Sequence, residues 1–370
     1  MEVIGIICEY NPFHYGHKYH INKIKELYKD SLIILVLNGY FLQRGDASIL
    51  TKEDKVKIAL ENNIDLVVEH PFIFASNSAD DFAESAITIL NHLKVNKIIF
   101  GSESNNIDLL VKIAKEQLSD TFNQKLKENL KKGISYPTAV NNSLSTSINL
   151  PNDLLGISYV KSIIKNNFNI KPITIKRTND YHDLNSNEKI VSASNIREKY
   201  KNNVNVDKYT NYKHLFQKIN EALLFNLLKY KISTDHDLSL FLTVDEGIEY
   251  KLIKEIKKSD NLKDFINNVK SKRYTHNRIK RMLVHILTGL TKQDKYNTNI
   301  EYIKVLGFNQ NGSDHLNHLR KISTIPIKRK IEETYLAQKY ELKAALIYDL
   351  LTGSNAYYYE SQNKPTKKQT

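Results

Sequence analysis

Apolar runs and amphipathic segments alternate over the first hundred residues. The runs VIGIIC, SLIILVLN, DLVVE and KIIFG are separated by segments with helically spaced apolar residues, at 17–28, 52–62 and 80–93. Short apolar runs that alternate with helices are typical of βαβ units, in which a parallel sheet is covered on both faces. The pattern therefore predicts an α/β fold with a Rossmann-like parallel sheet.

The pattern continues less regularly to about residue 200. Helices are expected at 107–132 and 155–165, a fifth strand at 171–177 (KPITIKR), and a further helix from near Ser194. Residues 134–153 have little periodicity, and we interpret them as a functional loop that closes over the site.

Strand signals become sparse after residue 200. The remaining segments are mostly amphipathic, and one of them places a single apolar face on a helix through Ile279, Met282, Leu283, Ile286 and Leu287. The sequence thus predicts a parallel-sheet catalytic domain over residues 1–200. A mainly α-helical, basic domain is expected over 201–370, with a frayed C-terminal tail.

Composition narrows the class of protein. A chain of 370 residues favours two domains. The single cysteine, Cys8, excludes an intramolecular disulfide framework and a cysteine-based zinc cluster, and its apolar strand makes it a core residue. The apolar run at residues 32–37 is too short to span a bilayer, and no secretory signal precedes it. We expect a cytosolic protein without a membrane segment; the sequence predicts no particular oligomeric state.

Positive charge is concentrated in the second half of the chain. Residues 1–200 contain 24 Lys and Arg against 23 Asp and Glu, whereas residues 201–370 contain 30 against 18. Within the second half, residues 251–300 contain 13 against 4. A lysine-rich composition would affect both halves equally. The asymmetry therefore predicts a polyanionic partner, most simply a nucleic acid, for the second half.

Three histidines cluster at the end of the first strand, in EYNPFHYGHKYH (residues 9–20). His14, His17 and His20 would share one side of a continuous helix, but no cysteine or HExxH-type glutamate completes a zinc site, and none is predicted. Phosphate binding fits better, because ligands of open parallel sheets bind beyond the carboxyl ends of strands at helix N-termini. Gly16 would allow close approach of the ligand, and Lys18 would stabilise charge on an α-phosphate.

HYGH after a first strand matches the HxGH signature of the nucleotidylyltransferase superfamily. SASNIR (residues 192–197) resembles the serine-rich stretch ending in arginine that these enzymes place at a late helix N-terminus. Ser192 or Ser194 can cap that helix while Arg197 reaches a phosphate.

More of the chain resembles one family, the tRNA(Met) cytidine acetate ligases. The similarity extends from Met1 to about residue 310 and rests on EYNPFHYGH, FLQRGD, GSE, PNDLLGISYVK, YHD, SASNIR, KSKRYTHNRIKRMLVHIL and YIKVLGFN. Three features depart from the family pattern: Asn38 stands where serine is common, His70 interrupts what is usually Glu-Leu-Pro, and the C-terminal end is short.

The resemblance implies an enzyme that activates acetate with ATP and acetylates the N4 amine of the wobble cytidine in elongator tRNA(Met). Acetyl-adenylate would be the intermediate, AMP and pyrophosphate the products, and Mg²⁺ would neutralise the leaving pyrophosphate. His14, His17 and Lys18 would be catalytic. The implied ATP-binding residues are Ile7, Cys8, Glu9, Tyr10, Asn11, Pro12, Phe13, His14, Tyr15, Gly16, His17, Lys18, Tyr19, His20, Gly101, Asn152, Arg177, Ser194 and Arg197.

The tRNA would be gripped by the basic segment of the second half. The expected contacts are Lys272, Arg273, Tyr274, Arg278 and Arg281. Arg44 and Lys52, after the second strand, are weaker candidates for the RNA or phosphate side.

Two alternatives stay open from sequence. A small-molecule adenylyltransferase shares both superfamily motifs but has no need of a basic second domain. A non-catalytic RNA-binding protein could keep a degenerate nucleotide fold, which the intact histidine motif disfavours. Acetate-dependent release of pyrophosphate separates the ligase from both.

Overall fold

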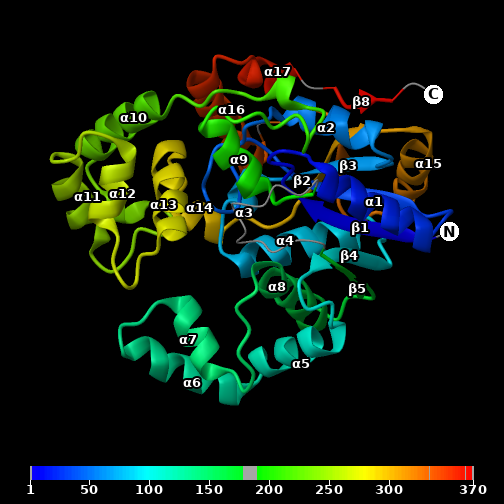
Figure 1. The fold of residues 1–370 in the computed structure, drawn as a ribbon, viewed down its shortest axis with the longest axis horizontal. Coiled ribbons are helices and arrows are strands. Elements are labelled where there is room, and N and C mark those ends of the chain that lie inside the picture. The colour runs from blue at the N-terminus through cyan, green and yellow to red at the C-terminus, as the bar shows by residue number, and fades with distance from the viewer. Residues whose placement is uncertain (1, 178–189, 333, 363, 369–370) are drawn as a thin grey trace.

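The computed structural model describes residues 2–177, 190–332, 334–362 and 364–368. A twisted sheet forms its centre, with strand order β5-β4-β1-β2-β3-β6-β7, and β8 pairs with β6. Strands β1 to β5 are parallel. Figure 1 shows the sheet at one end of the molecule and a helical lobe at the other.

The strands have the following bounds: β1 Val3–Cys8, β2 Leu32–Asn38, β3 Leu66–His70, β4 Lys97–Ser102, β5 Lys171–Lys176, β6 Ile303–Phe308, β7 Ile327–Lys328 and β8 Thr366–Lys367. The helices of the first half are α1 Tyr15–Leu27, α2 Lys52–Glu61, α3 Phe72–Ala75, α4 Ala79–His92, α5 Ile107–Gln117, α6 Asp120–Lys131, α7 Tyr136–Ser143, α8 Pro151–Lys165 and α9 Ala193–Lys201. The later helices are α10 Glu221–Thr234, α11 Ile248–Ile256, α12 Leu262–Val269, α13 His276–Thr288, α14 Lys292–Tyr296, α15 Gln310–Leu319, α16 Leu336–Thr352 and α17 Ala356–Gln362, with short 3₁₀ helices at Lys213–Leu215 and Leu238–Leu240.

Alternate residues of each central strand enter two different cores. Leu32, Ile34 and Val36 of β2 pack with α4, α5, α8 and α15 on one face of the sheet. Ile33 and Leu35 of the same strand pack with α1 and α2 on the other face. Successive side chains of a strand point to opposite faces, so a strand covered on both sides has to be apolar throughout, as predicted.

The sheet does not end at residue 200. Strand β6 lies antiparallel to β3, so the second half of the chain contributes to the same sheet as the first. The prediction of a frayed C-terminal tail is wrong for residues 364–368. There β8 pairs with β6, and the Lys368 side chain donates a 2.8 Å hydrogen bond to the Leu60 carbonyl. The domain boundary near 200 stays a prediction, but the sheet crosses it.

Two segments of the first half differ in detail from the pattern. The helix expected over 107–132 is divided into α5 and α6, because Ser119 caps a new helix through the Phe122 amide. The loop expected over 134–153 contains α7, which begins at a serine cap followed by Tyr136 and Pro137. Figure 1 shows α6 and α7 projecting from the sheet beside α5.

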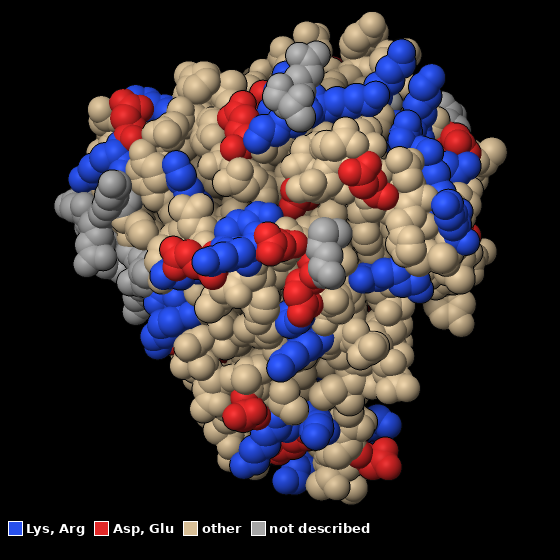
Figure 2. Space-filling view, turned by 90° about the vertical axis from the view of Figure 1, so that its right-hand side faces the viewer, with Lys and Arg blue, Asp and Glu red and all other residues tan. Residues whose placement is uncertain are grey.

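Most of the remaining helices form the lobe beyond the sheet. Helices α10 to α13 enclose a core of their own, which confirms the amphipathic face of α13. A further core, to which α3, α13, α16 and α17 contribute, connects this lobe to the rest. On the side that carries α15 and the chain ends, Lys and Arg are interspersed with Asp and Glu (Figure 2). Among the described residues, no helix combines the length and apolarity needed to cross a membrane.

Candidate active site at the carboxyl ends of β1, β4 and β5

A pocket of about 290 Å³ opens where β1, β4 and β5 end and where α1, α8 and α9 begin. Its floor is apolar and includes Ile7, Ile99 and Tyr159. Its polar wall carries histidine and arginine side chains. An apolar floor with convergent cationic and N–H groups suits a nucleotide, whose base and phosphates need different surroundings.

His14 and His17 close the N-terminus of α1 by capping each other. His14 Nδ1 accepts a 2.9 Å hydrogen bond from the Gly16 amide, and His17 Nδ1 accepts one of 3.3 Å from the His14 amide. An imidazole whose Nδ1 accepts from the backbone carries its proton on Nε2 when it is neutral. Both rings are thereby fixed as Nε2–H donors, and both line the pocket.

Gly16 is required by the cap itself. A β-carbon at this position would lie 2.6 Å from His14 Cε1 and 2.9 Å from Nδ1. The space that the sequence pattern assigns to a ligand is therefore filled by the His14 ring, and any larger residue would displace it.

The three histidines are neutral at pH 7. Burial, reinforced by the charges of Arg177 and Arg197, lowers the pKa of His14 to about 3. Burial lowers the pKa of His20 to about 4, and burial together with His14 lowers that of His17 well below its usual value. The positive charge of the site therefore comes from arginine, and His14 and His17 act as hydrogen-bond donors.

The two arginines reach the pocket from different elements. Arg197, on α9, donates a 2.6 Å hydrogen bond to the Asn11 carbonyl and one of 3.2 Å to Ser194 Oγ. Arg177 follows β5 directly, and its aliphatic part covers Gly101. Arg177 Nε and His20 Nε2 are buried and have no hydrogen-bond partner in the described structure. Buried polar atoms without a partner favour a polar ligand in the pocket.

The GSE and PND motifs, fifty residues apart, hold each other at the rim of the pocket. Glu103 accepts hydrogen bonds from the Asn152 amide, the Asn152 side chain and the Asp153 amide, at the N-terminus of α8. Asp153 in turn accepts from the Glu103 and Ser104 amides and from Ser102 Oγ. This reciprocal contact places Asn152 beside Gly101 in the pocket wall.

Most of the predicted ATP-binding residues meet in this pocket. Those that line it are Ile7, Cys8, Glu9, Tyr10, Asn11, His14, Gly16, His17, Tyr19, His20, Gly101, Asn152, Arg177, Ser194 and Arg197. Four predicted residues lie outside it: Pro12, Phe13, Tyr15 and Lys18. Lys18 is exposed and borders a separate shallow depression, so the geometry does not bring it to the reacting phosphate.

The sequence motifs did not identify every residue of the pocket wall. Gln43, Asp46 and Tyr159 line the pocket but were not among the predicted site residues. Gln43 and Asp46 belong to FLQRGD, which follows the second strand, so their position beyond a strand end was the available signal. Arg44, from the same motif and a weaker candidate, also lines the pocket.

The basic segment before and within α13 has mixed exposure. Lys272 and Arg273 are exposed, and Arg273 pairs with Glu246 at 3.0 Å. Tyr274 is buried and has Arg278 stacked on its ring at 4.1 Å, so a stacking contact between this ring and a tRNA base does not fit the structure. Burial lowers the pKa of Arg281 to about 10.

Helix α13 reaches the pocket through the loop that follows β2. Lys280 pairs with Asp46 at 2.7 Å. The backbone at Gly45 lies against α13, because a β-carbon there would meet Arg281 N at 2.5 Å. The helical lobe is therefore in contact with the pocket wall. The YHD motif, residues 181–183, lies outside the described residues.

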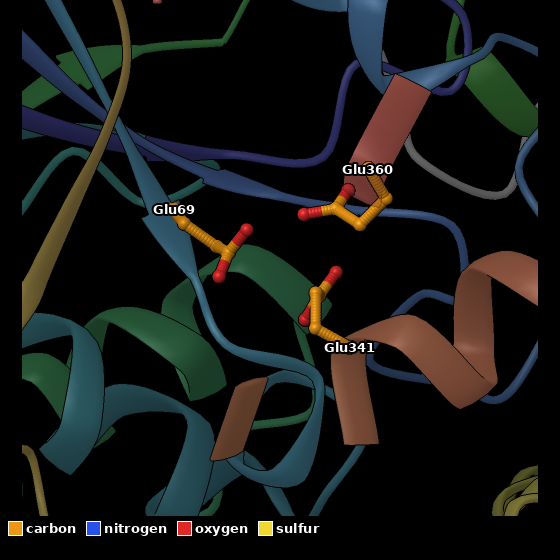
Figure 3. Close-up of side chains that lie close together, drawn as sticks. All are labelled: Glu69, Glu341 and Glu360. Carbon is orange, nitrogen blue, oxygen red and sulfur yellow. The ribbon is translucent and has the colours of Figure 1, made fainter. Parts of the chain in front are cut away.

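Lys52 is not available to a ligand. It is completely buried, and its ammonium group contacts Glu69 at 2.9 Å, Glu341 at 2.6 Å and Glu360 at 2.6 Å. Figure 3 shows the three carboxylates, from β3, α16 and α17, pointing toward one another. Lys304 also contacts two of them, so lysine fills the position that a metal ion would take.

Comparisons with known proteins show the family of the chain. The family model described as HIGH Nucleotidyl Transferase matches residues 1–365. A tRNA(Met) cytidine acetate ligase of Geobacillus sp. (strain WCH70) is 36% identical over 363 residues, covering 90% of this chain and 89% of the relative. The ligase of Clostridium novyi (strain NT) is 35% identical over 401 residues, covering 99% of both chains.

Solved structures give the same result. The apo structure of Thermotoga maritima TmcAL superposes with a TM-score of 0.89 at 27% identity, covering 100% of both chains. The same protein bound to alpha-thio ATP gives a TM-score of 0.86 at 26% identity, again with 100% of both chains covered. The chain belongs to the tRNA(Met) cytidine acetate ligase family.

Proposed function

We propose that this protein is an ATP-dependent ligase that acetylates the N4 amine of the wobble cytidine in elongator tRNA(Met), with acetate as the acyl source. The observation that carries the proposal is the pair of mutually capped, neutral histidines at the N-terminus of α1, beside two arginines. This pair lies in a chain that is 36% identical to named ligases over most of its length. Because the substrate is a tRNA, we place the activity in the cytoplasm.

In the first step an acetate oxygen attacks the α-phosphate of ATP, and pyrophosphate leaves as acetyl-adenylate forms. The Nε2–H groups of His14 and His17 would donate to phosphate oxygens on which charge develops. Arg177 and Arg197 would supply the compensating positive charge. No covalent enzyme intermediate is required, which agrees with Cys8, whose pKa burial raises to about 12.

Mg²⁺ would neutralise the leaving pyrophosphate. Mg²⁺ in nucleotide sites is held largely by phosphate oxygens and water, with few protein carboxylates. Among the described residues the one group of three carboxylates is the lysine-filled cluster around Glu69, which does not line the pocket. We therefore propose that Mg²⁺ enters with ATP.

In the second step the cytidine amine attacks the activated acetyl carbon and AMP leaves. The base has to leave the anticodon loop to reach the pocket, so the rest of the tRNA needs a separate grip. We propose that Lys272, Arg273, Arg278 and Arg281 contribute to it, since α13 abuts the loop lining the pocket. The turn between α6 and α7 faces the same surface, because a β-carbon on Gly133 would lie 3.9 Å from Arg273 Nη2.

The test is to measure pyrophosphate release by the purified protein with ATP and Mg²⁺, each with and without acetate and total tRNA. Nucleosides of the recovered tRNA are analysed by mass spectrometry. Acetate-dependent release together with N4-acetylcytidine in the tRNA supports the ligase. Release that depends on a small-molecule acceptor would indicate the adenylyltransferase, and tRNA binding without any pyrophosphate release would indicate the non-catalytic alternative.

A further inference from the structure

Glu9 is the residue that joins the end of β1 to the histidine motif, and its carboxylate uses only one of its two oxygens. Oε1 accepts a 2.7 Å hydrogen bond from the Gln43 amide and one of 3.1 Å from Asn38 Nδ2. Oε2 has no hydrogen-bond partner among the described residues, although Glu9 lines the pocket. One oxygen is thus anchored and the other is available to a ligand.

Asn38, which donates to Glu9, is itself held in place by a buried hydrogen-bond network. Asn38 Oδ1 lies 3.2 Å from His70 Nδ1, and His70 Nε2 lies 2.7 Å from Ser85 Oγ. Asn38 and His70 are completely buried, so this chain from α4 through β3 and β2 to Glu9 is fixed by packing. A side chain held by a buried network keeps its orientation without help from the ligand.

Acetyl transfer to cytidine needs a proton acceptor, because the N4 amine loses a proton as the amide forms. His14 and His17 present Nε2–H toward the pocket and cannot accept there. Cys8 and Tyr159 are neutral, since burial raises the pKa of both. Asp46 is paired with Lys280. Two carboxylates line the pocket among the described residues, and Glu9 is the one that has no ion pair.

We propose, on the basis of the ligase function proposed above, that Glu9 is the general base of the acetyl-transfer step. The N4 lone pair forms the bond to the acetyl carbon, and Oε2 takes the proton from N4. The bond between the acetyl carbon and the phosphate oxygen then breaks, and AMP leaves with that electron pair. The proton passes from Glu9 to solvent, so the products are the acetylated cytidine, AMP and one proton.

The electrostatic surroundings of Glu9 suit a base. Burial raises its pKa from the ordinary value, opposed by the Gln43 hydrogen bond and by the charges of Lys55, Arg44 and Arg197. Of the other groups that face it, Lys55 lies behind it on α2, and burial lowers the pKa of that lysine to about 7. A carboxylate with a raised pKa is a stronger base than one exposed to water.

The test uses Glu9→Gln, which preserves shape. The amide oxygen of glutamine can accept from Gln43 and Asn38 as Oε1 does, while the amide nitrogen replaces the basic oxygen. Acetate-dependent ATP–pyrophosphate exchange reports the first step, and single-turnover transfer from preformed acetyl-adenylate to tRNA reports the second. We expect exchange within about fivefold of wild type and a loss of at least about 100-fold in transfer, in the range of general-base catalysis.

The pH profile distinguishes a base from a purely structural residue. Transfer by the wild type should rise with pH through the pKa of Glu9, and the rise should be absent in Glu9→Gln. Asp314→Asn removes the same charge at an exposed position outside the pocket and should keep the rise. A parallel fall of exchange and transfer in Glu9→Gln, or an unchanged transfer rate, would overturn the assignment. Wild type that shows neither acetate-dependent exchange nor acetylated tRNA would instead overturn the proposed ligase function, and the Glu9 step with it.

Discussion

His17 has two roles that a single substitution removes together. It accepts from the His14 amide in the cap of α1, and it presents Nε2–H to the pocket. His17→Ala should therefore lose about 1 kcal/mol of stability with the cap and slow adenylate formation by roughly 100-fold to 1,000-fold with the donor. His17→Gln should recover the melting temperature, because glutamine at this helix position completes a capping box, but should leave the exchange rate low. If the ATP–pyrophosphate exchange rate of His17→Gln recovered together with its melting temperature, the proposed contact between His17 and a phosphate would be wrong.

His70 should make stability depend on pH. Burial lowers its pKa to about 3, whereas an unfolded histidine titrates near 6.5. Between these values the unfolded chain binds a proton that the folded chain does not, so the free energy of unfolding should fall as the pH is lowered from about 6.5 toward 4. In urea titrations, His70→Gln should reduce the dependence of the unfolding free energy on pH by about 1.4 kcal/mol per pH unit. His214→Gln, at an exposed position, should leave this dependence unchanged. Equal slopes for the two variants would count against a buried neutral His70.

At the scale of single residues, the sequence predicted the pocket better than it predicted roles. The HxGH motif brings His14, Gly16 and His17 to the pocket because a strand-to-helix turn is a local structure, and their roles stay predictions. It also suggested Lys18, but the helical turn points this residue to solvent, a direction that depends on where α1 begins. The functions of Asn38 and His70, which support Glu9, depend on contacts between three strands and a helix that no local pattern encodes.

At the scale of elements, the loop before α13 is the part of the proposed tRNA grip that is open to solvent. Lys272→Ala combined with Arg273→Ala should weaken tRNA binding and reduce the slope of log K against log salt by roughly 1 to 2, because two phosphate contacts are lost. Filter binding between 50 and 200 mM salt measures both quantities. Tyr274→Phe removes only the hydroxyl bond to the Asp245 carbonyl and should keep the slope. An unchanged slope in the double variant would place the grip elsewhere.

The elements themselves were predicted where they repeat a simple pattern. Strands β1 to β5 and helices α1, α2, α4 and α8 follow the alternation of apolar runs and amphipathic segments. Strand β6 has an apolar run of the same kind, but it lies between α14 and α15, and its partner β3 is more than two hundred residues away in the chain. A local sequence pattern does not predict which strand pairs with another over such a separation, because the pairing depends on how the whole chain folds. The tail strand β8 depends in turn on β6.

At the scale of the whole molecule, five buried charges connect the two halves of the chain. Lys52 and Glu69 come from the first half, and Lys304, Glu341 and Glu360 come from the second. Two ammonium groups face three carboxylates, so one negative charge is in excess. Burial raises the pKa of Glu341 to about 7, whereas the charges of Lys304 and Lys52 outweigh burial at Glu360 and lower its pKa to about 2. The surplus charge is therefore assigned to Glu341.

This difference predicts unequal effects of one chemical change at two neighbouring positions. Glu360→Gln leaves two buried lysines with fewer charged partners and should cost about 3–5 kcal/mol of unfolding free energy at pH 8. Glu341→Gln removes the surplus charge and should cost less than about 2 kcal/mol, since an amide can still accept from the Phe72 amide. The pKa of Glu341 is raised in the folded protein, so the free energy of unfolding of the wild type should fall as the pH rises from about 4.5 to 7. Glu341→Gln should abolish this part of the pH dependence. Urea unfolding of both variants decides the matter: equal losses would mean that Glu341 and Glu360 share the surplus charge evenly.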